Sequence, residues 1–573
     1  MITAIITDIT WERVLLSLKV EIQNGPKDPI DFYLVNEEGK ACAKFEVEYK
    51  DPEHCCLTIN VTNKGNRACI GNGIYSIYAY NSNLEPIKLK INEKTAAIIN
   101  TKTRYMLHGT KGSGMCLYFS LEEARGILYP QIQVIHAIQQ DYYRRTLVKQ
   151  LIYIKNRIKR NVYRFIYKRA YSIFHFFPHK THVLFMSEQN TSPNANFIAV
   201  EHRIKERSLD KEFVILHSFR SSPVYKYSYF SWFCLAIKIA KSDIIFVDDY
   251  CPVLDWLRLR PDTKLIQLWH AGAGYKTVGY SRWGYKNSPP GRCCHRKYTY
   301  CIAPSKNTAC FFWEQFGINP EQVLPTGMPR MDKYLNAEYR SQKTKEIYDM
   351  YPQLKGKKVI LFAPTYRGDG KWDAYYPYEK INFEKLFEFC GETYITIFRM
   401  HPWVKDPVPI KEEWKSRFID ANNYPDIDDL FYVTDIFITD YSSGIFEYSV
   451  MHKPALFYAF DEIEYSYSRG FHRSYRESTP GKICHAFDEL LHAIQRNDFE
   501  FEKMEKYVAQ HFDNLDGGAC DRVIDWCLLD KLPQEYLDAK QKRIEDNAKL
   551  KELQFPATII QTRVMLQQGK VKQ

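Results

Sequence analysis

A histidine followed by a glycine-rich segment is the first place in the 573-residue sequence where we expect chemistry. His270 comes directly after two apolar runs, at 244–247 and 264–268, that are typical of buried strands. Open α/β sheets place their chemistry at the carboxyl ends of such strands. His270 can move a proton near pH 7, Lys276 can contact an anion, and Gly272 lets the backbone approach a ligand. We predict that Lys276 and Gly272 contact an acceptor or a phosphate; a core histidine beside a helix cap is the alternative for His270.

Three later apolar runs, at 359–363, 394–398 and 435–438, each end in a polar turn. The first turn contains Arg367, the second contains Arg399 and His401, and the third contains Ser442 and Ser443. The carboxyl ends of parallel strands meet at one edge of a sheet, so we expect these turns to lie together. Arginines, hydroxyls and free backbone N–H groups bind phosphate, and this combination indicates a site for a pyrophosphate.

The alternation of short buried strands with helix-length segments predicts an α/β fold with two Rossmann-like domains, at 181–345 and 355–495. Residues 1–125 alternate with period two between turn residues, which predicts a small β-sandwich with a structural or docking role. Residues 498–573 are expected to form C-terminal helices, one of which could cross back over the first Rossmann-like domain. The last forty or so residues are expected to fray.

A basic stretch at 140–178 separates the β domain from the first Rossmann-like domain. Its ten cations are interleaved with apolar residues at spacings of three and four, which predicts an amphipathic helix on an anionic membrane surface. Nucleic acid and a solvated linker helix packed on the next domain are the alternatives. The predicted membrane-binding residues are Arg144, Arg145, Lys149, Lys155, Arg157, Lys159, Arg160, Arg164, Lys168 and Arg169.

Composition limits the class of protein. The chain is 45% hydrophobic and 26% charged, as expected for a folded protein, and its net charge of +11 favours anionic partners. Fifteen cysteines without CxxC pairs indicate reduced thiols in the cytosol and no zinc site. The pair Asp248 and Asp249 suggests a metal, but we interpret it as an end-of-strand turn. No signal peptide and no run of 18 apolar residues is found, so we expect neither export nor a membrane span.

Four motifs together resemble those of the CDP-glycerol glycerophosphotransferase family, whose members prime and polymerise teichoic acids and related polyol phosphates. They are Leu268-Trp269-His270-Ala271 with Lys276 and Gly279, Ala363-Pro364-Thr365-Tyr366-Arg367, Arg399-Met400-His401-Pro402 and Thr439-Asp440-Tyr441-Ser442-Ser443. The resemblance covers roughly 180 to 530. The opening segment Ile9-Thr10-Trp11-Glu12-Arg13-Val14 also resembles the start of ribitol-phosphate primases and polymerases.

The resemblance implies a GT-B fold whose two domains face a cleft, with no cofactor and no metal. It implies that His270 and His401 are the catalytic residues. The expected CDP-alditol contacts are Arg367, Arg399, Thr439, Asp440, Ser442, Ser443 and Glu447. Two features depart from many glycerol enzymes: Ala271-Gly272-Ala273 stands in place of Gly-Thr-Pro, and Glu447 stands where an Asp is common. These departures leave the identity of the alditol open.

The implied activity is transfer of ribitol phosphate or glycerol phosphate from CDP-ribitol or CDP-glycerol to a hydroxyl of a lipid-linked teichoic acid or capsular acceptor, with release of CMP. His270 is the expected general base, and the cations of the second domain are expected to stabilise the transferring phosphoryl group. We expect a peripheral protein on the cytoplasmic face of the cell membrane that binds no nucleic acid. A GT-B glycosyltransferase that uses a nucleotide sugar and a non-catalytic membrane scaffold are the alternatives.

Overall fold

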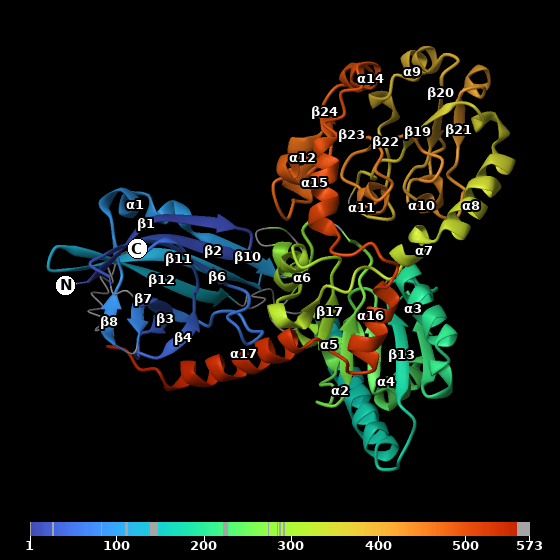
Figure 1. Cartoon of the computed structure of the whole chain (residues 1–573). Coiled ribbons are helices and arrows are strands. Elements are labelled where there is room, and N and C mark those ends of the chain that lie inside the picture. The colour runs from blue at the N-terminus through green and yellow to red at the C-terminus, as the bar shows by residue number, and fades with distance from the viewer. Residues whose placement is uncertain are drawn as a thin grey trace. The chain divides into compact units, whose positions relative to one another are not determined.

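The computed structural model describes residues 2–25, 28–81, 83–108, 113–137, 147–221, 227–272, 274–282, 285, 288–289, 293–368 and 370–557 (Figure 1). The described residues fall into two compact units. One unit lies within Met1–Tyr142, Tyr280–Gly291 and Asp538–Gln573, and the other lies within Tyr143–Gly279 and Arg292–Leu537.

The first unit contains two mainly antiparallel sheets. One has the order β5-β6-β2-β1-β9, from β1 (Thr3–Glu12), β2 (Leu15–Gln23), β5 (Glu46–Asp51), β6 (His54–Asn60) and β9 (Lys90–Ile91). The other has the order β10-β11-β12-β7-β3-β4, from β3 (Asp31–Asn36), β4 (Ala41–Lys44), β7 (Gly73–Asn81), β10 (Arg104–His108), β11 (Ser113–Ala124) and β12 (Ile127–Ala137), with β8 (Leu84–Lys88) beside β7. Between β9 and β10 lie α1 (Glu93–Ala97) and the 3-10 helix η1 (Ile99–Lys102).

Strands β2, β5, β6 and β7 lie in the part of the sequence, residues 1–125, whose period-two pattern predicted strands. Alternate residues of β2 are buried, as the pattern requires of a strand with one face in a core. The predicted boundary at residue 125 needs correction because it falls in the turn of the β11–β12 hairpin. The strand β12 pairs with both β11 and β7, so the sheet continues to Ala137.

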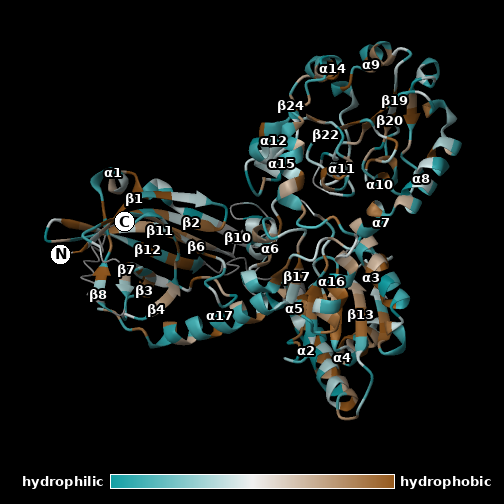
Figure 2. Cartoon of the chain, in the orientation of Figure 1, coloured by the Kyte–Doolittle hydropathy of each residue, from teal (hydrophilic) through white to brown (hydrophobic). Residues whose placement is uncertain are grey.

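The C-terminal segment returns to the first unit. After α17 (Gln534–Glu552), which is largely hydrophilic (Figure 2), the Phe555 backbone N–H donates to the Gly39 carbonyl at 2.7 Å. The Phe555 ring is buried and lies 5.6 Å from Tyr33 and 5.4 Å from Tyr78. The expectation that the last forty residues fray is therefore wrong up to Phe555, because an aromatic side chain anchors them; residues 558–573 lie outside the described residues.

The second unit holds two parallel sheets whose central strands are buried on both faces and are mostly apolar (Figure 2). The first has the order β14-β13-β15-β16-β17-β18, from β13 (His182–Ser187), β14 (Val214–Phe219), β15 (Ile244–Val247), β16 (Lys264–Gln267), β17 (Tyr300–Ile302) and β18 (Val323–Leu324). Its helices are α3 (Ala195–Glu206), α4 (Tyr229–Lys241), α5 (Pro252–Trp256) and α6 (Ala309–Phe316), followed by α7 (Met331–Leu335) and α8 (Ala337–Met350).

The second parallel sheet has the order β21-β20-β19-β22-β23-β24, from β19 (Lys358–Phe362), β20 (Tyr394–Phe398), β21 (Phe418–Asp420), β22 (Ile436–Thr439), β23 (Ala455–Tyr458) and β24 (Lys482–Cys484). Its helices are α9 (Phe383–Cys390), α10 (Ile427–Leu430), α11 (Ile445–Ser449), α12 (Glu462–Ser468), α13 (Tyr475–Ser478) and α14 (Phe487–Gln495). The strand order reverses between β19 and β22. Open α/β sheets bind ligands in the crevice at such a switch point.

Contacts within the second unit join its two sheets. The Arg330 guanidinium, just before α7, donates to the Glu447 carboxylate of α11, and both side chains are buried. Helices α15 (Glu502–His511) and α16 (Ala519–Val523) and the π-helical turn η9 (Ile524–Leu528) follow the second sheet and return to the first. Arg203 of α3 pairs with Asp521 of α16 at 2.8 Å. A helix that crosses back over the first Rossmann-like domain was expected, and α16 does so.

The basic stretch forms α2 (Leu147–Phe174), which packs with one face on α4 and α5. Its buried residues are Tyr163, Tyr167, Ala170 and Tyr171. The apolar face that the spacing indicated is a different one: Leu151, Ile154, Ile158, Val162 and Phe165 are exposed. The linker-helix alternative is thus correct for one face of α2, and the other face presents unpaired apolar side chains. None of the described helices is long and apolar enough to cross a membrane.

Candidate active site

His270 lies in the turn after β16 and is held in one orientation. Its Nδ1 is 3.2 Å from the carbonyl oxygen of Asp248 and 3.7 Å from Oδ2 of Asp249. A carbonyl only accepts hydrogen bonds, so Nδ1 donates, and Nε2 is the nitrogen that can accept a proton. The side chain is 50% exposed. This arrangement suits a general base, because the carboxylate beside the ring stabilises the imidazolium that forms.

The turn that presents His270 is built from strained backbone and buried hydrogen bonds. Trp269 has a φ of 44°, in the left-handed region that residues other than glycine rarely adopt. Its backbone N–H donates to Oε1 of Gln267 at 2.8 Å, and its carbonyl accepts from Nδ2 of Asn196 at 2.8 Å. Strain held in this way by its surroundings is common at functional sites.

Asp248 and Asp249 lie in a turn at the end of β15, as the sequence indicated. Asp249 also lies beside His270, which the sequence did not indicate. Burial raises the pKa of Asp248, whose carboxylate accepts from Asn190. The Asp249 carboxylate accepts a hydrogen bond from the Tyr250 backbone N–H and lies beside the His270 ring. Only the pairing of β15 with β16 brings this carboxylate to the imidazole.

The segment that follows His270 extends to the second parallel sheet. The Tyr275 carbonyl accepts from the His472 N–H at 2.9 Å, and the Thr277 hydroxyl donates to the Arg469 carbonyl at 2.8 Å. The backbone of Lys276 forms an isolated antiparallel β-bridge with that of Phe471. The charge of the Lys276 side chain is one cause of the lowered pKa of His401. We name residues 270–279 the connecting loop; it has the base candidate near one end and a cation beside the second histidine.

Gly272 allows the connecting loop to pack. A Cβ built on it would lie 2.4 Å from the ring of Phe446 in α11. The structure therefore explains this glycine by close packing against the helix that follows Ser442 and Ser443, and its contact with a ligand stays a prediction.

His401 differs from His270 in its protonation. Burial, and then the charges of Lys276 and Arg399, lower the pKa of His401 to about 4, so the ring is neutral at pH 7. Its Nδ1 accepts the Trp403 backbone N–H at 3.2 Å, which leaves the proton on Nε2. A neutral imidazole with Nε2–H can donate a hydrogen bond to a phosphoryl oxygen but is a poor base.

Arg399 is a buried cation whose charge no carboxylate neutralises directly. Its guanidinium donates to the carbonyls of Asn422 at 2.8 Å and Tyr424 at 3.1 Å, and within the described residues its Nε has no partner. Burial lowers its pKa. A buried cation in this state has strong affinity for an anion, which fits the predicted contact with a diphosphate.

Arg367 is held differently, and its predicted role needs correction. Its Nε and Nη2 bind the carboxylate of Asp461 at 2.5 and 2.9 Å, and its Nη1 donates to Asp440 at 2.9 Å. Burial opposes the charged form, but the two carboxylates outweigh it and raise the pKa of Arg367. The guanidinium therefore joins the turns after β19 and β22 instead of facing an open position.

Three other residues that were predicted to contact the CDP-alditol also bind to partners within the protein. Asp440 is buried and accepts from the Thr365 N–H at 2.8 Å, the Thr439 hydroxyl donates to the Ala363 carbonyl at 2.8 Å, and Glu447 pairs with Arg330. These residues position the turn after β22. Ser443 is exposed and Ser442 is partly exposed, so their hydroxyls are the accessible groups of the turn.

Arg469 is a cation that the sequence analysis did not single out. Its Nη2 donates to the Gly368 carbonyl at 2.7 Å and to the Tyr366 hydroxyl at 3.3 Å. The Tyr366 ring in turn lies 4.7 Å from His401. No strand-end pattern marks Arg469, because it follows a helix, α12.

The predicted membrane residues are only partly described. Arg144 and Arg145 lie outside the described residues, and Lys149 is described only in its backbone. Lys159 faces the protein, with its Nζ 4.2 Å from the Trp232 ring, while the Arg164 Nε donates to the Trp256 carbonyl at 2.5 Å. Arg160 is partly buried; the exposed remainder is Lys155, Arg157, Lys168 and Arg169.

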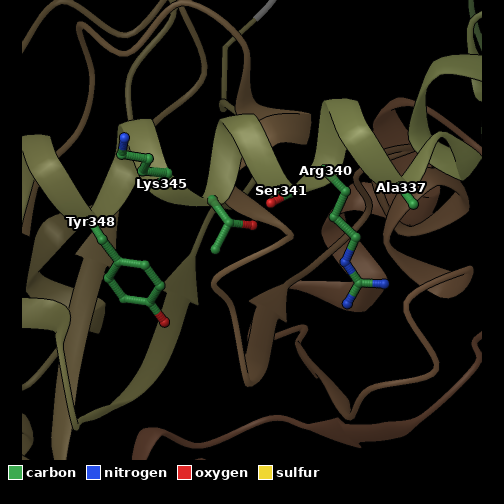
Figure 3. A pocket seen from close by; sticks show the side chains of 6 residues that line it. Ala337, Arg340, Ser341, Lys345 and Tyr348 are labelled. Atoms are coloured by element: carbon green, nitrogen blue, oxygen red, sulfur yellow. The ribbon is translucent and has the colours of Figure 1, made fainter.

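A pocket of about 370 Å³ lies along α8, where Figure 3 shows Arg340 and Tyr348 extending from the same side of the helix. None of its six lining residues belongs to the motifs, and we assign it no part in the site.

The chain is similar to proteins of one known family. The sequence profile described as "CDP-Glycerol:Poly(glycerophosphate) glycerophosphotransferase" matches residues 169–529. The chain is 38% identical over 368 residues to "Teichoic acid ribitol-phosphate polymerase TarL" of Staphylococcus aureus (strain NCTC 8325 / PS 47), covering 64% of this chain and 66% of that protein. It is 35% identical over 384 residues to "Teichoic acid poly(ribitol-phosphate) polymerase" of Bacillus spizizenii, covering 66% and 61%. The matches thus span somewhat less than two thirds of these relatives.

The mixed α/β fold resembles that of a solved structure. A variant of "the Wall Teichoic Acid Polymerase TagF" superposes with a TM-score of 0.52 at 22% identity, covering 68% of this chain and 98% of the other.

Proposed function

Because this chain belongs to the CDP-Glycerol:Poly(glycerophosphate) glycerophosphotransferase family, we propose that it transfers an alditol phosphate from a CDP-alditol to a hydroxyl of a lipid-linked acceptor and releases CMP. The observation that supports this most directly is the connecting loop, which begins at His270 and contains Lys276, whose charge helps to lower the pKa of His401. One segment thereby supplies a proton acceptor and a cation to the same reaction.

His270 acts as the general base. Its Nε2 removes the proton from the acceptor hydroxyl as the oxygen attacks the β-phosphorus of the donor, and the bond from that phosphorus to the oxygen of the departing CMP breaks. The Asp249 carboxylate stabilises the imidazolium from the Nδ1 side. A positioned base of this kind contributes on the order of 10²–10⁴-fold to the rate.

His401, Arg399 and Lys276 stabilise the charge that develops on the phosphoryl group and on CMP. His401 donates from Nε2, and Arg399 and Lys276 supply positive charge; among the described residues, neither of them forms an ion pair with a carboxylate. Each well-placed donor of this type lowers the barrier by on the order of 3 kcal/mol. Ser442 and Ser443 supply hydroxyl donors at the switch point of the second sheet, while Arg367, Asp440, Thr439 and Glu447 hold that turn in place.

Ribitol is the alditol that the comparisons favour. Both relatives named above have ribitol phosphate in their names. The Ala271-Gly272-Ala273 form of the connecting loop agrees with this choice, because it departs from the Gly-Thr-Pro of many glycerol enzymes.

Helix α2 places the enzyme on the membrane that contains its acceptor. Its exposed apolar side chains, Leu151, Ile154, Ile158, Val162 and Phe165, are accompanied by the exposed cations Lys155, Arg157, Lys168 and Arg169. An exposed apolar stripe flanked by Lys and Arg is the pattern of a helix that lies in the interface of an anionic bilayer. The aromatic face of the same helix attaches it to the protein.

The deciding experiment offers CDP-ribitol and CDP-glycerol separately, with a synthetic lipid-linked acceptor, and measures CMP release and the product mass. We expect CMP and an acceptor heavier by one or more ribitol phosphates. Release of UDP from a nucleotide sugar would instead identify a glycosyltransferase, and no turnover of either CDP-alditol would favour a non-catalytic scaffold.

A further inference from the structure

A cluster of two histidines and an aspartate lies where α2 ends, and the proposed transfer does not use it. His175 follows the last residue of α2, His179 lies in the segment before β13, and Asp243 lies between α4 and β15. Nδ1 of His175 is 3.6 Å and Nε2 of His179 is 3.4 Å from the same oxygen, Oδ1 of Asp243. Within the part of the chain that the structure describes, this is the one group of three such side chains whose ligand atoms lie within 4.8 Å of one another.

Both rings are oriented from behind by backbone carbonyls. Nε2 of His175 is 3.1 Å from the Ala240 carbonyl oxygen, and Nδ1 of His179 is 3.0 Å from that of Phe177. These nitrogens must donate, because carbonyl oxygens only accept. In the neutral rings, the opposite nitrogens therefore direct lone pairs toward Oδ1 of Asp243. Three electron-rich atoms in such an arrangement repel one another unless positive charge lies between them.

The spacing fits a small metal ion. Ligands at 2.0–2.1 Å from a tetrahedral Zn²⁺ are separated by about 3.4 Å. The two nitrogen–oxygen distances are 3.4 and 3.6 Å, and all three ligand atoms lie within 4.8 Å of one another. Histidines that bind metals generally donate their outer N–H to a carbonyl or carboxylate, as both rings do here. Asp243 is also fixed, because its Oδ2 accepts the His182 N–H at 2.8 Å.

We propose that His175, His179 and Asp243 bind one divalent transition-metal ion of the zinc class, with water completing the coordination. The proposal differs from the sequence-based expectation of no metal, and the spacing His175-x₃-His179 is its signal in the sequence. The ion would join the end of the amphipathic helix α2 to the first parallel sheet through Asp243. Its role would be to fix the attachment of the helix.

A proton is the competing explanation. If both nitrogens of His179 are protonated, the ring is an imidazolium paired with Asp243. The hydrogen bond to Phe177 and the Asp243 carboxylate do raise the pKa of His179. A doubly protonated His179 accounts for one of the two contacts but leaves Nδ1 of His175 without a role.

The test uses the full chain without a histidine tag, treated with EDTA and then titrated with Co²⁺ while the visible absorption is followed. We expect one Co²⁺ per chain with the d–d bands of nitrogen and oxygen ligands and without the near-ultraviolet charge-transfer band of a thiolate. His179→Ala and Asp243→Asn should each weaken binding roughly tenfold or more. Asn keeps an oxygen for the His182 N–H, and His179 is exposed, so both variants should fold.

His202→Ala is the matched control, because His202 is also exposed and also lies beside a carboxylate, that of Glu206, at 3.4 Å. It should bind Co²⁺ as the wild type does. The proposal is overturned if no Co²⁺ binds, if the thiolate band appears, or if the two cluster variants bind as well as the control. Any of these results would leave the proposed transfer intact, because none of the three residues belongs to the transfer site.

Discussion

At the scale of single residues, the two histidines of the proposed site are prepared for opposite tasks. His270 donates from Nδ1 and has Nε2 available as a base, whereas His401 accepts at Nδ1 and has Nε2–H available as a donor. The two arginines differ in the same way: Arg367 is neutralised by Asp440 and Asp461, and Arg399 is held by carbonyls alone. In the proposed mechanism, side chains of the same type therefore divide into base and donor, and into positioning residue and ligand contact.

We expect His270→Ala to lower the rate of CMP release by about 10²–10⁴-fold, because the base is lost. The side chain is half exposed, so the melting temperature and the affinity for CDP-ribitol should stay close to those of the wild type. Turnover within tenfold of the wild type would exclude His270 as the base. His202→Ala, in an exposed helix, controls for the loss of a histidine.

For His401, the substitution by Gln should be tolerated better than the substitution by Ala. Gln keeps an N–H donor, whereas Ala removes it, at a cost on the order of 3 kcal/mol in transition-state stabilisation. Steady-state kinetics with CDP-ribitol would measure this difference. Equal losses in kcat/KM for the two variants would contradict a donor role.

Stability should fall as the pH is lowered from about 6.5 to 4. The folded-state pKa of His401 is about 4, below the ordinary value of 6.5, so between these values the unfolded chain binds more protons than the folded one. The stabilising contribution is present above the unfolded pKa and is lost through this window, at about 1.4 kcal/mol per pH unit for such a group. Urea unfolding of His401→Gln should show a smaller decline than the wild type, and an identical decline would refute the assignment.

At the scale of elements, the connecting loop and α2 each perform two functions. The loop presents His270 and also docks on the segment at 469–472, while α2 is attached by one face and exposes another. A glycine-rich segment marks the loop in the sequence, and the spacing of apolar residues marks α2. The residues that each element packs against lie far away in the chain.

Gly272→Ala should impair catalysis because its Cβ would meet the Phe446 ring at 2.4 Å and displace the loop. Phe446→Leu in the same chain should relieve part of the clash, so that the effects of the two substitutions on kcat are not additive. A coupling of about 0.5–3 kcal/mol is typical of residues in contact. Additive effects in a double-mutant cycle would mean that the ring does not limit the loop.

Replacing Lys155, Arg157, Lys168 and Arg169 by Ser should release the protein from anionic vesicles in a sedimentation assay, since each cation near the surface contributes about 1 kcal/mol. The matched control replaces Lys540, Lys542, Lys549 and Lys551 of α17, which are exposed on a helix with no buried residue. That control changes the net charge equally and should leave binding intact. Equal loss in both variants would indicate attraction by net charge alone.

At the scale of the whole molecule, ion pairs connect the two parallel sheets of the second unit. Arg330 and Glu447 are both buried, and a second pair joins the buried Glu314 of α6 to the partly exposed Arg473 in the segment between α12 and α13. Burying a charge costs free energy that only its partner offsets, so such pairs set how the sheets meet. Glu447 is thus part of the framework of the site.

Glu447→Gln should destabilise the protein by about 3–5 kcal/mol, because it leaves the Arg330 guanidinium buried without its anion. The double substitution Arg330→Met with Glu447→Gln should lose less stability than Glu447→Gln alone. Chemical unfolding measures both. An unchanged unfolding free energy together with a raised KM for CDP-ribitol would restore the original prediction that Glu447 contacts the donor.

Local sequence determined where the proposed site lies: a strand followed by a polar or glycine-rich turn is a local pattern, and His270, Arg399, His401 and the serines at 442 and 443 all stand at such turns. Tertiary structure decided what each side chain does there. The pairing of Arg367 with Asp461, the tautomers of the two histidines and the contact of Gly272 with Phe446 arise between residues far apart in the chain. Charge neutralisation and hydrogen-bond direction depend on such non-local partners, so no local pattern could have predicted them.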